Sequence, residues 1–463
     1  MEKLDIVVGG GIAGLLAALI LSEKQQRKVI LIERENELGG LLRSFDYGIY
    51  GKFDYGMHNM YETGIRELDE FLFDLLPDSE WQILEGSKRD LAGAIYAGNV
   101  QYNSPFIDLR NLAKKEHELC VSTFFSQLDE IETSIDKSAY EYNRTRFGDE
   151  IAKRLDQILR KQFGKSSKQL DWFANYLSTL YRVVLFGECA IQKLNQSNHL
   201  RELIAWPEQR TLPSNLESGR RAYYPKEYGM YRIVDSIKAR LLAADVEVYT
   251  SSEVVDMSID SDRVSSIKIR AADGEKTVSS LDNIIWTSGL HSAAKTLGIN
   301  LLEYQFDRPR KTIVVNMVLE RPPLMEDLYY LYSFELNSNI FRITNYFNYC
   351  KNATRADGWP ISVELLIDEV LGDREMCDMA INQIIDTGII LKYSDVIFSC
   401  AEIVNPGFPM PTIKNFTAIE SIRKDINSIG AKNLHVVGVQ TEKDIFFQRD
   451  VISQVWKKME QLN

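Results

Sequence analysis

The chain has 463 residues, of which 45% are hydrophobic and 26% charged, an ordinary composition for a folded protein of two or three domains. Its formal net charge of -12 argues against nucleic-acid binding, because a surface that binds phosphates needs a basic balance. The 5 cysteines are scattered and include no Cys-x-x-Cys pair. They predict free, buried thiols in a reducing compartment, with neither a zinc site nor a disulfide framework.

Residues 6–21 form an apolar stretch that superficially resembles a signal peptide or membrane anchor. Its centre, however, is a run of glycines, and Ser22, Glu23 and Lys24 follow where a cleavage site would require small residues. No other stretch reaches the roughly 18 apolar residues that are needed to span a bilayer. We therefore expect no membrane span and a cytoplasmic location.

The same N-terminal segment predicts one βαβ unit. Residues 4–8 form a short apolar run typical of a buried parallel strand, residues 12–24 an apolar helix, and residues 29–32 a second buried strand. Strand, glycine turn, helix and strand within about 30 residues is the unit from which dinucleotide-binding sheets are built.

Gly9, Gly11 and Gly14 occupy the turn of this unit with the Gly-x-Gly-x-x-Gly spacing. The first glycine permits the tight turn, the second lets the backbone approach a pyrophosphate, and the third lets the helix pack close to the strand. Ile12 and Ala13, at the helix N-terminus, would offer unpaired N–H groups to the phosphates. The alternative is a glycine turn that packs a helix and binds nothing.

Glu33 lies 19 residues after Gly14, at the end of the second predicted strand. A carboxylate at that position accepts hydrogen bonds from ribose hydroxyls and disfavours a 2′-phosphate. Arg34 follows directly, and we include it in the predicted cofactor site. The alternative for Glu33 is an ordinary surface glutamate.

From residue 65 to about residue 205 the pattern changes to long stretches with apolar residues at three-to-four spacing, notably residues 109–151 and 153–185. Few turn signals interrupt them, so we predict a helical insertion. Glycines and prolines return near Tyr223, and a helix at residues 231–243 follows. Strands are then predicted near residues 246–249, 264–269 and 283–286.

The segment from residue 311 to residue 366 has a strong β signature. Strands are predicted there at residues 313–318, 329–334, 341–347 and 361–366. A late buried strand at residues 433–438 ends in Gly438, and a terminal helix is predicted at about residues 449–459.

Residues 37–44 (Glu-Leu-Gly-Gly-Leu-Leu-Arg-Ser) resemble the second glycine motif of a large flavoprotein group. That group contains amine oxidases, protoporphyrinogen oxidases, phytoene desaturases and UDP-galactopyranose mutases. The resemblance implies that this segment passes beside the pyrophosphate and ribitol of FAD, through Gly39, Gly40, Leu41 and Arg43. The alternative for the glycine pair is a helix C-cap before a turn.

Other segments are similar to further elements of the same group. Residues 53–58 resemble the segment along one face of the isoalloxazine ring, and residues 224–230 resemble the group's Tyr-Pro element. Residues 252–255 resemble the strand whose backbone contacts the adenine, which implies a contact from Val254.

Residues 437–451 resemble the closing element of the group, where a helix N-terminus points at the flavin. The partial positive charge of that terminus would stabilise the anionic reduced flavin. The resemblance implies cofactor contacts from Gly438, Gln448, Arg449 and Val451. The mutases carry a Gly-Arg pair where this chain has Gly438 and Val439, and their tyrosine-rich stretch is altered, which weakens the mutase reading.

His58 and Arg342 are the predicted catalytic residues. The resemblance places His58 beside the flavin, where an imidazole that titrates near neutrality is suited to act as acid or base. The alternative is a structural imidazole bonded to backbone. Arg342 lies inside a predicted strand, where a charge is costly unless it faces a pocket, a partner or solvent. Glu364 is its predicted partner.

Other side chains are suited to holding a substrate. Arginine grips phosphate or carboxylate with two parallel bonds, and the further candidates are Arg182, Arg220, Arg221 and Arg310. Tyrosines in the β-rich segment are suited to wall a site for a ring or a sugar, and these are Tyr329, Tyr330, Tyr332, Tyr346 and Tyr349. The alternative for both sets is ordinary sheet surface. We predict no metal site.

The sequence therefore predicts an α/β fold with two domains. Residues 1–64, 206–304 and 398–463 would form a discontinuous Rossmann-type FAD-binding domain. Residues 65–205 and 305–397 would form a mixed helical and β-sheet substrate domain, with the active site between the two. No second Gly-x-Gly-x-x-Gly turn follows a strand, so no separate NAD(P)H domain is predicted.

The function predicted first is an FAD-dependent oxidoreductase of the amine oxidase and protoporphyrinogen oxidase type, acting on a small-molecule substrate, with an anionic substrate as one alternative. The second is a UDP-galactopyranose mutase-like enzyme that acts on a nucleotide sugar without net redox change. The third is a flavin-binding protein without catalysis, in which the helical insertion serves a partner.

Overall fold

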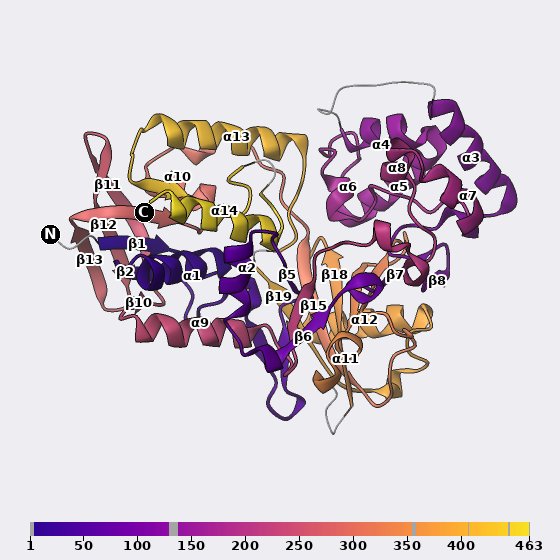
Figure 1. The fold of residues 1–463 in the computed structure, drawn as a ribbon, viewed down its shortest axis with the longest axis horizontal. Helices are drawn as coiled ribbons and strands as arrows, with labels where there is room; N and C mark the ends of the chain where they lie inside the picture. Colours follow the sequence, from indigo (N-terminus) through magenta and orange to yellow (C-terminus); the bar gives the residue numbers. More distant parts are fainter. Residues whose placement is uncertain (1–3, 129–137, 354–357, 406, 443–444, 463) are drawn as a thin grey trace.

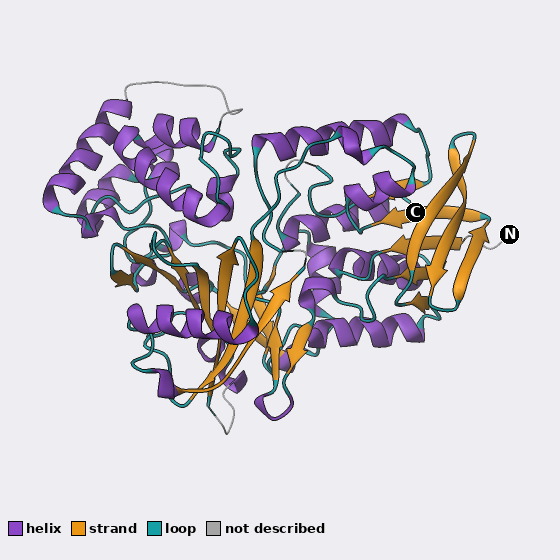
Figure 2. Cartoon of the chain, turned by 180° about the vertical axis from the view of Figure 1, so that it is seen from behind, coloured by secondary structure: helices purple, strands orange, loops and turns teal. Residues whose placement is uncertain are grey.

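Two large sheets organise the protein, and a group of helices stands beside one of them (Figures 1 and 2). The computed structural model describes residues 4–128, 138–353, 358–405, 407–442 and 445–462.

The first sheet is five-stranded and parallel. In spatial order its strands are β10 (Glu247–Tyr249), β2 (Lys28–Ile32), β1 (Leu4–Val8), β14 (Leu281–Trp286) and β20 (Leu434–Val436). Val7 lies opposite Leu31 on one side and Ile285 on the other, so β1 is the centre of the sheet. A strand that is covered on both faces needs apolar side chains on both, which is why β1 is apolar apart from Asp5.

Helices cover both faces of this sheet. On one face, α1 (Ile12–Leu19), α9 (Tyr231–Ala243) and α14 (Gln448–Glu460) share a core with Val7 and Leu31. On the other, α10 (Leu290–Thr296), α13 (Ile413–Ser428) and a small sheet of β11 (Glu253–Asp260), β12 (Arg263–Ala271) and β13 (Gly274–Ser279) cover Ile6 and Val8. This two-sided arrangement is the predicted Rossmann-type fold, and the predicted α/β fold class is confirmed.

The second sheet is seven-stranded and mixed. In spatial order it contains β19 (Val396–Val404), β15 (Lys311–Leu319), β18 (Trp359–Ile367), β17 (Ile340–Asn345), β16 (Tyr330–Ser333), β7 (Ala92–Tyr96) and β8 (Asn99–Gln101). Helix α12 (Asp373–Asp386) covers one face, where Val315 and Val363 join its apolar residues in one core. The opposite face carries polar side chains.

The helical group has a core of its own. It consists of α3 (Lys114–Leu128), α4 (Ala139–Phe147), α5 (Asp149–Phe163), α6 (Ala174–Leu177), α7 (Glu188–Leu194) and α8 (Asn198–Leu203). Smaller elements join the parts: β3 (Ser44–Asp46), β4 (Lys52–Asp54), β5 (Met60–Tyr61), α2 (Arg66–Phe73), β6 (Trp81–Leu84), β9 (Ala222–Pro225) and α11 (Tyr346–Tyr349).

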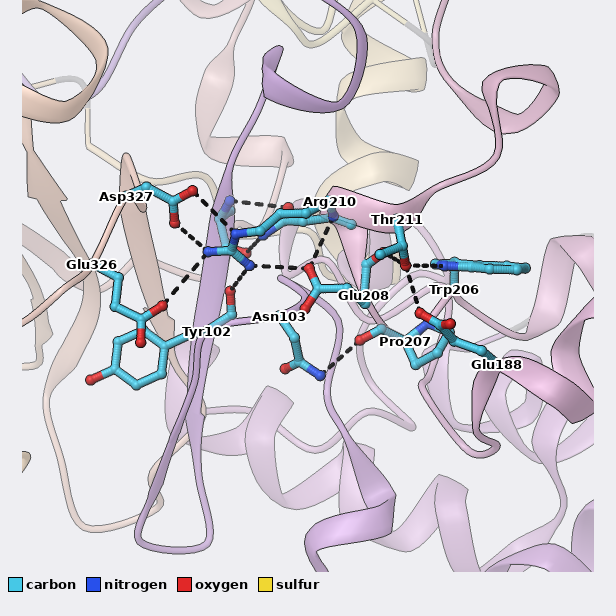
Figure 3. Close-up of polar contacts among 12 residues, drawn as sticks. Tyr102, Asn103, Glu188, Trp206, Pro207, Glu208, Arg210, Thr211, Glu326 and Asp327 are labelled. Carbon is cyan, nitrogen blue, oxygen red and sulfur yellow. Dashed lines mark hydrogen bonds and ion pairs between the residues drawn. The ribbon is translucent and has the colours of Figure 1, made fainter.

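Hydrogen bonds and ion pairs of Arg210 link the segment after the helical group to the seven-stranded sheet (Figure 3). Its guanidinium donates to the Tyr102 carbonyl over 2.8 Å, just after β8, and forms ion pairs with Glu208 and Asp327. Hydrogen bonding to Asp327 raises the pKa of Arg210, against the smaller opposing effect of burial. A network of several charges contributes more than an isolated surface pair.

Several predictions of local structure were wrong. The region of residues 65–205 is not helical throughout, because β6, β7 and β8 lie within it. The predicted helix 153–185 ends with α5, where Gly164 takes the left-handed conformation that closes many helices. The predicted helix 109–151 corresponds to α3, α4 and the start of α5, and its residues 129–137 lie outside the described residues.

Strand β19 falls across the predicted domain boundary at residue 398. It pairs with β15 along its length, so residues up to Val404 belong to the seven-stranded sheet. Residues 346–347, predicted as strand, belong to α11 instead. α12, α13, β13 and β19 were not predicted from the sequence as elements.

Candidate functional site

The turn between β1 and α1 is shaped for a group that approaches the backbone closely. Gly9 has a φ of +109°, and a Cβ at Gly14 would overlap the Gly9 carbonyl oxygen. Gly11, the N-cap of α1, faces open space: a Cβ built there would meet nothing within 4 Å, and no side chain caps the helix. The first N–H groups of α1, at Ile12 and Ala13, are therefore oriented to meet an anion.

The second glycine segment folds back onto this turn. Gly39 donates its N–H to the Gly10 carbonyl over 2.7 Å and pairs with Gly11 in an isolated parallel bridge. A Cβ at Gly40 would lie 3.0 Å from the Gly11 Cα, so both glycine segments border the same open space. No described helix ends before the pair, which argues against the helix C-cap alternative.

The Glu33 carboxylate lies at the same turn. Its Oε2 accepts the Gly10 N–H, and its Oε1 accepts the Glu35 N–H over 2.8 Å. Each oxygen keeps a second lone pair, so the held carboxylate is still able to accept a ribose hydroxyl. Arg34 is 71% exposed and forms an ion pair with Glu35, which places its guanidinium at the surface.

The other predicted cofactor residues of this segment surround the turn. Leu41 is 38% exposed, and Arg43 donates to the Gly40 carbonyl over 3.0 Å. The Arg43 guanidinium lies 5.0 Å from the centre of the Tyr55 ring, a cation–π distance. Val254 is buried in β11, where its carbonyl faces the Thr296 hydroxyl.

The closing element follows the edge strand β20. Gly438 has a φ of +120° and donates its N–H to the Gln454 side chain over 2.9 Å. Gln448 begins α14 and contacts the Met60 sulfur at 3.2 Å, while Arg449 forms an ion pair with Asp450 and Val451 is buried. The Asp450 carboxylate also accepts the Phe447 N–H, so an acidic side chain already caps this helix N-terminus.

A polar stripe crosses the face of the seven-stranded sheet opposite α12. The strand register aligns two rows of side chains on this face, because residues two apart on a strand point the same way. The stripe consists of Tyr332, Arg342, Glu364 and Glu402 in one row, where Val314 separates the two glutamates, and Tyr330, Thr344, Ser362, Asn316 and Cys400 in the next. The protein itself covers part of this face: Asn316 and Ser362 are fully buried and bond to each other, to the Tyr47 hydroxyl and to the Tyr346 hydroxyl.

His58 meets this stripe at the Arg342–Glu364 pair. A Cβ at Gly56 would lie 3.4 Å from Glu364 Oε1 and 3.9 Å from Arg342 Nη2. Arg342 binds Glu364 with two bonds, Nε to Oε1 at 2.8 Å and Nη2 to Oε2 at 3.0 Å, which confirms the predicted partner. The charges of Arg342 and Glu364 both act on the His58 imidazole, so the two predicted catalytic residues lie near each other.

The environment of His58 defines its protonation. The Nδ1 atom lies 3.0 Å from the Gly56 carbonyl oxygen, which only accepts, so Nδ1 carries the proton and donates. Burial, and then the charge of Arg342, lowers the pKa of His58 below its usual 6.5. At pH 7 the imidazole is therefore neutral, and its Nε2 is left with a lone pair.

Asp90 and a group of tyrosines extend the cluster, and the sequence reasoning missed Asp90, Tyr61 and Tyr181. The Tyr330 hydroxyl donates to Asp90 Oδ1 over 2.7 Å. Burial raises the pKa values of Tyr61, Tyr181 and Tyr332, and the nearby Asp90 charge raises them further. Asp90 ends a polar turn after β6, so only its position in the fold marks it as a site residue.

Of the remaining predicted substrate residues, some lie at or near the polar stripe and others form contacts elsewhere. Arg182 lies near the Tyr181 ring, and its Nε is buried without a partner among the described residues. Three arginines serve other contacts: Arg221 pairs with Glu62, Arg310 pairs with Asp368, and Arg220 lies against Gly64. Of the tyrosines, Tyr330 and Tyr332 belong to the stripe, Tyr329 bonds the Lys88 carbonyl, and Tyr346 and Tyr349 lie in the aromatic core.

Asp54 holds the segment that leads to His58. It is fully buried, and its carboxylate accepts the Tyr224 hydroxyl at 2.7 Å and the Met230 N–H at 3.0 Å. Tyr224 belongs to β9, and Met230 precedes α9, so one side chain joins both predicted motif segments, residues 53–58 and 224–230. Burial raises the pKa of Asp54 to about 6, although these bonds oppose the rise.

The fold and the turn define the class: an α/β protein with a Rossmann-type sheet and a second, sheet-based part beside the Gly9–Gly14 turn. A family model described as an NAD(P)-binding Rossmann-like domain matches residues 7–74. The comparison of the sequence with curated proteins found no match.

Several solved structures share the fold over the whole chain. A reduced UDP-galactopyranose mutase is 17% identical with a TM-score of 0.77, and the match covers 100% of this chain and 95% of that one. A provisionally named protoporphyrinogen oxidase from Exiguobacterium sp. 255-15 is 14% identical with a TM-score of 0.72, covering 100% and 99%. A triple mutant of putrescine oxidase is 12% identical with a TM-score of 0.62, covering 100% and 98%. The chain therefore has the fold of the group that its glycine motifs resemble.

Two features of the described residues bear on membrane and metal binding. None of the helices described there combines the length and the apolar character that a bilayer crossing requires. The same part of the chain contains no group of three or more His, Cys, Asp or Glu side chains placed to hold a metal ion.

Proposed function

We propose that the chain is an FAD-dependent oxidoreductase that removes a hydride from a small-molecule substrate. The observation that carries the proposal is the open space at Gly11, which is bordered by the uncapped N-terminus of α1 and by the Gly39–Gly40 segment. Such a space fits a pyrophosphate, and the Glu33 carboxylate beside it fits a ribose. These residues would hold the adenine dinucleotide half of the cofactor, and Arg43 would reach toward its ribitol.

The polar stripe supplies the other side of the proposed site. When bound, FAD supplies a ring that accepts a hydride. His58 would accept a substrate proton at Nε2, because its Nδ1 is committed to the Gly56 carbonyl. Arg342 would hold a fixed positive charge beside the substrate, and Glu364 would keep its guanidinium oriented.

The proposed division into domains follows from the two sheets. Residues 1–64, 206–304 and about 405–463 would bind the cofactor, and the helical group with the seven-stranded sheet would bind the substrate. The boundary moves from residue 398 because β19 pairs within the seven-stranded sheet.

A second candidate is a mutase that acts on a nucleotide sugar without net redox change. The observation that favours it is the TM-score of 0.77 with the reduced UDP-galactopyranose mutase, over the whole of this chain. The tyrosine hydroxyls and the unpartnered Arg182 Nε near the polar stripe are donors suited to a diphosphate.

The first test is an absorption spectrum of the purified protein, followed by heat release and identification of the cofactor. Oxidised flavin bands with FAD in the supernatant support the proposal, and a colourless protein that takes up no added FAD overturns it. Anaerobic bleaching by an amine or another small reductant supports the oxidoreductase. Interconversion of UDP-galactopyranose and UDP-galactofuranose only after dithionite reduction, without such bleaching, supports the mutase instead.

A further inference from the structure

The edge strand β20 forms the floor of a groove that is distinct from the polar stripe and from the Gly9–Gly14 turn. The groove has a volume of about 860 Å³. Residues of α13 and α14 form its walls, and Leu434, His435 and Val436 lie between them. All three strand residues are half-exposed, whereas the central strands of the same sheet are buried.

The outer edge of β20 is open. In the described part of the chain, β20 pairs with β14 alone. Ile284 donates its N–H to the Asn433 carbonyl, and Val437 donates to the Trp286 carbonyl. Successive residues of a strand direct their backbone groups to opposite sides, so Leu434 and Val436 direct theirs away from β14, toward the groove.

These outward groups form a short template for another strand. The Leu434 N–H is used by the Ala431 carbonyl at 3.2 Å, which leaves the Leu434 carbonyl and both backbone groups of Val436 on the open edge. An extended peptide that runs along such an edge satisfies these groups and its own at once.

The walls of the groove carry an excess of positive charge. Arg423 comes from α13 and donates to the Thr441 carbonyl over 3.3 Å, and Lys457 and Lys458 come from α14. Among the described residues, none of the three has an ion-pair partner. The fourth cation, Lys432, pairs with Asp262 outside the groove wall.

The acids of the groove are already engaged. Asp450 accepts the Phe447 N–H at the start of α14, and Glu442 accepts a side-chain N–H of Gln454 over 3.0 Å. Burial, and then the charges of Lys458 and Arg263, lower the pKa of His435 to about 4, so this side chain on the floor is neutral at pH 7. This local excess stands out on a chain with a net charge of -12.

We propose that this groove binds an extended acidic segment of a partner protein, which adds to β20 as a further strand. The backbone of the segment would pair with Leu434 and Val436, and its carboxylates would meet Lys457, Lys458 and Arg423. Lysines also serve on sheet edges to prevent self-association, and the experiment below separates the two roles.

The test measures binding of a fluorescein-labelled peptide with alternating Val and Glu to the full-length, FAD-loaded protein by fluorescence anisotropy. Two comparison peptides are used: one with Lys in place of Glu, and one that is N-methylated at alternate residues. We expect the acidic peptide to bind, with an affinity that falls as salt rises. Both comparison peptides should bind at least about tenfold more weakly, which corresponds to about 1.4 kcal/mol.

The matched variants are Lys457→Glu/Lys458→Glu in the groove and Lys114→Glu/Lys115→Glu on the exposed start of α3. The first should weaken binding of the acidic peptide at least about tenfold while keeping the flavin spectrum and a cooperative unfolding transition, and the second should bind as the wild type does. Equal binding of the N-methylated peptide would overturn strand addition. If the groove variant binds the acidic peptide as well as the wild type does and also self-associates, the lysines only protect the edge of β20 from self-association. That outcome would also overturn the proposal.

Discussion

Asp54 should make the protein less stable at pH 7 than at pH 5. Burial raises the pKa of this carboxyl from 3.8 to about 6 in the folded state. Between pH 3.8 and about pH 6, the folded protein keeps a proton on Asp54 that the unfolded chain has lost. Protonation therefore stabilises the folded state fully below pH 3.8, and this stabilisation is lost as the pH rises through about 6. The two pKa values give a loss of about 1 kcal/mol between pH 5 and pH 7.

The assay compares urea unfolding of the wild type and of Asp54→Asn at both pH values. His58, whose pKa is lowered, acts in the opposite direction, but its contribution cancels in the difference between the two proteins. We expect the increase in unfolding free energy from pH 7 to pH 5 to be about 1 kcal/mol smaller in the variant than in the wild type. Asp46→Asn, at an exposed carboxylate of the same hairpin, is the control and should keep the wild-type difference.

The same pH dependence in Asp54→Asn and in the wild type would refute the reasoning. The bonds from Tyr224, Met230 and Ser44 favour the ionised carboxylate, whereas burial favours the neutral acid. An unchanged pH dependence would mean that the three bonds outweigh burial, and that Asp54 stays ionised throughout the range.

Three further predictions concern the site itself. Gly14→Ala should yield protein without bound flavin, because the added Cβ overlaps the turn, whereas Gly219→Ala, at an open position, should keep the flavin spectrum. Glu364→Ala should lower the free energy of unfolding by about 3 kcal/mol, because it leaves the Arg342 guanidinium without its partner and Arg342 is only 18% exposed. A loss under about 1 kcal/mol would mean that solvent already screens the pair. If His58 accepts the substrate proton, turnover should fall on the acid side only below pH 6.5, and His58→Gln should lose that limb of the profile.

The glycine turn was predictable because its constraints are local. Gly9, Gly11 and Gly14 are set by a backbone turn and a helix start a few residues apart, and the apolar strands on either side need no knowledge of distant segments. The same holds for β15, β17 and β18, whose β-branched and aromatic residues give a strong pattern at short range.

The elements that were missed depend on distant partners. β7 has the sequence Ala-Gly-Ala-Ile-Tyr, which has no clear strand pattern, and it becomes a strand because β16 and β8 pair with it on either side. A Cβ at Gly93 would lie too close to the neighbouring β8 backbone and to the Leu331 side chain, so the small residues are required by packing that the sequence alone does not show.

The polar stripe explains why the site could be predicted only in part. Arg342 and Glu364 are 22 residues apart, and the alternation of each strand indicates separately that they share a face. Cys400, Asn316 and Tyr330 join them only through the register of five strands, which no local pattern records. A strand that places an arginine among apolar neighbours therefore gives a useful signal: the charge needs a partner on the adjacent strand, and the face that carries both is the face to search for a site.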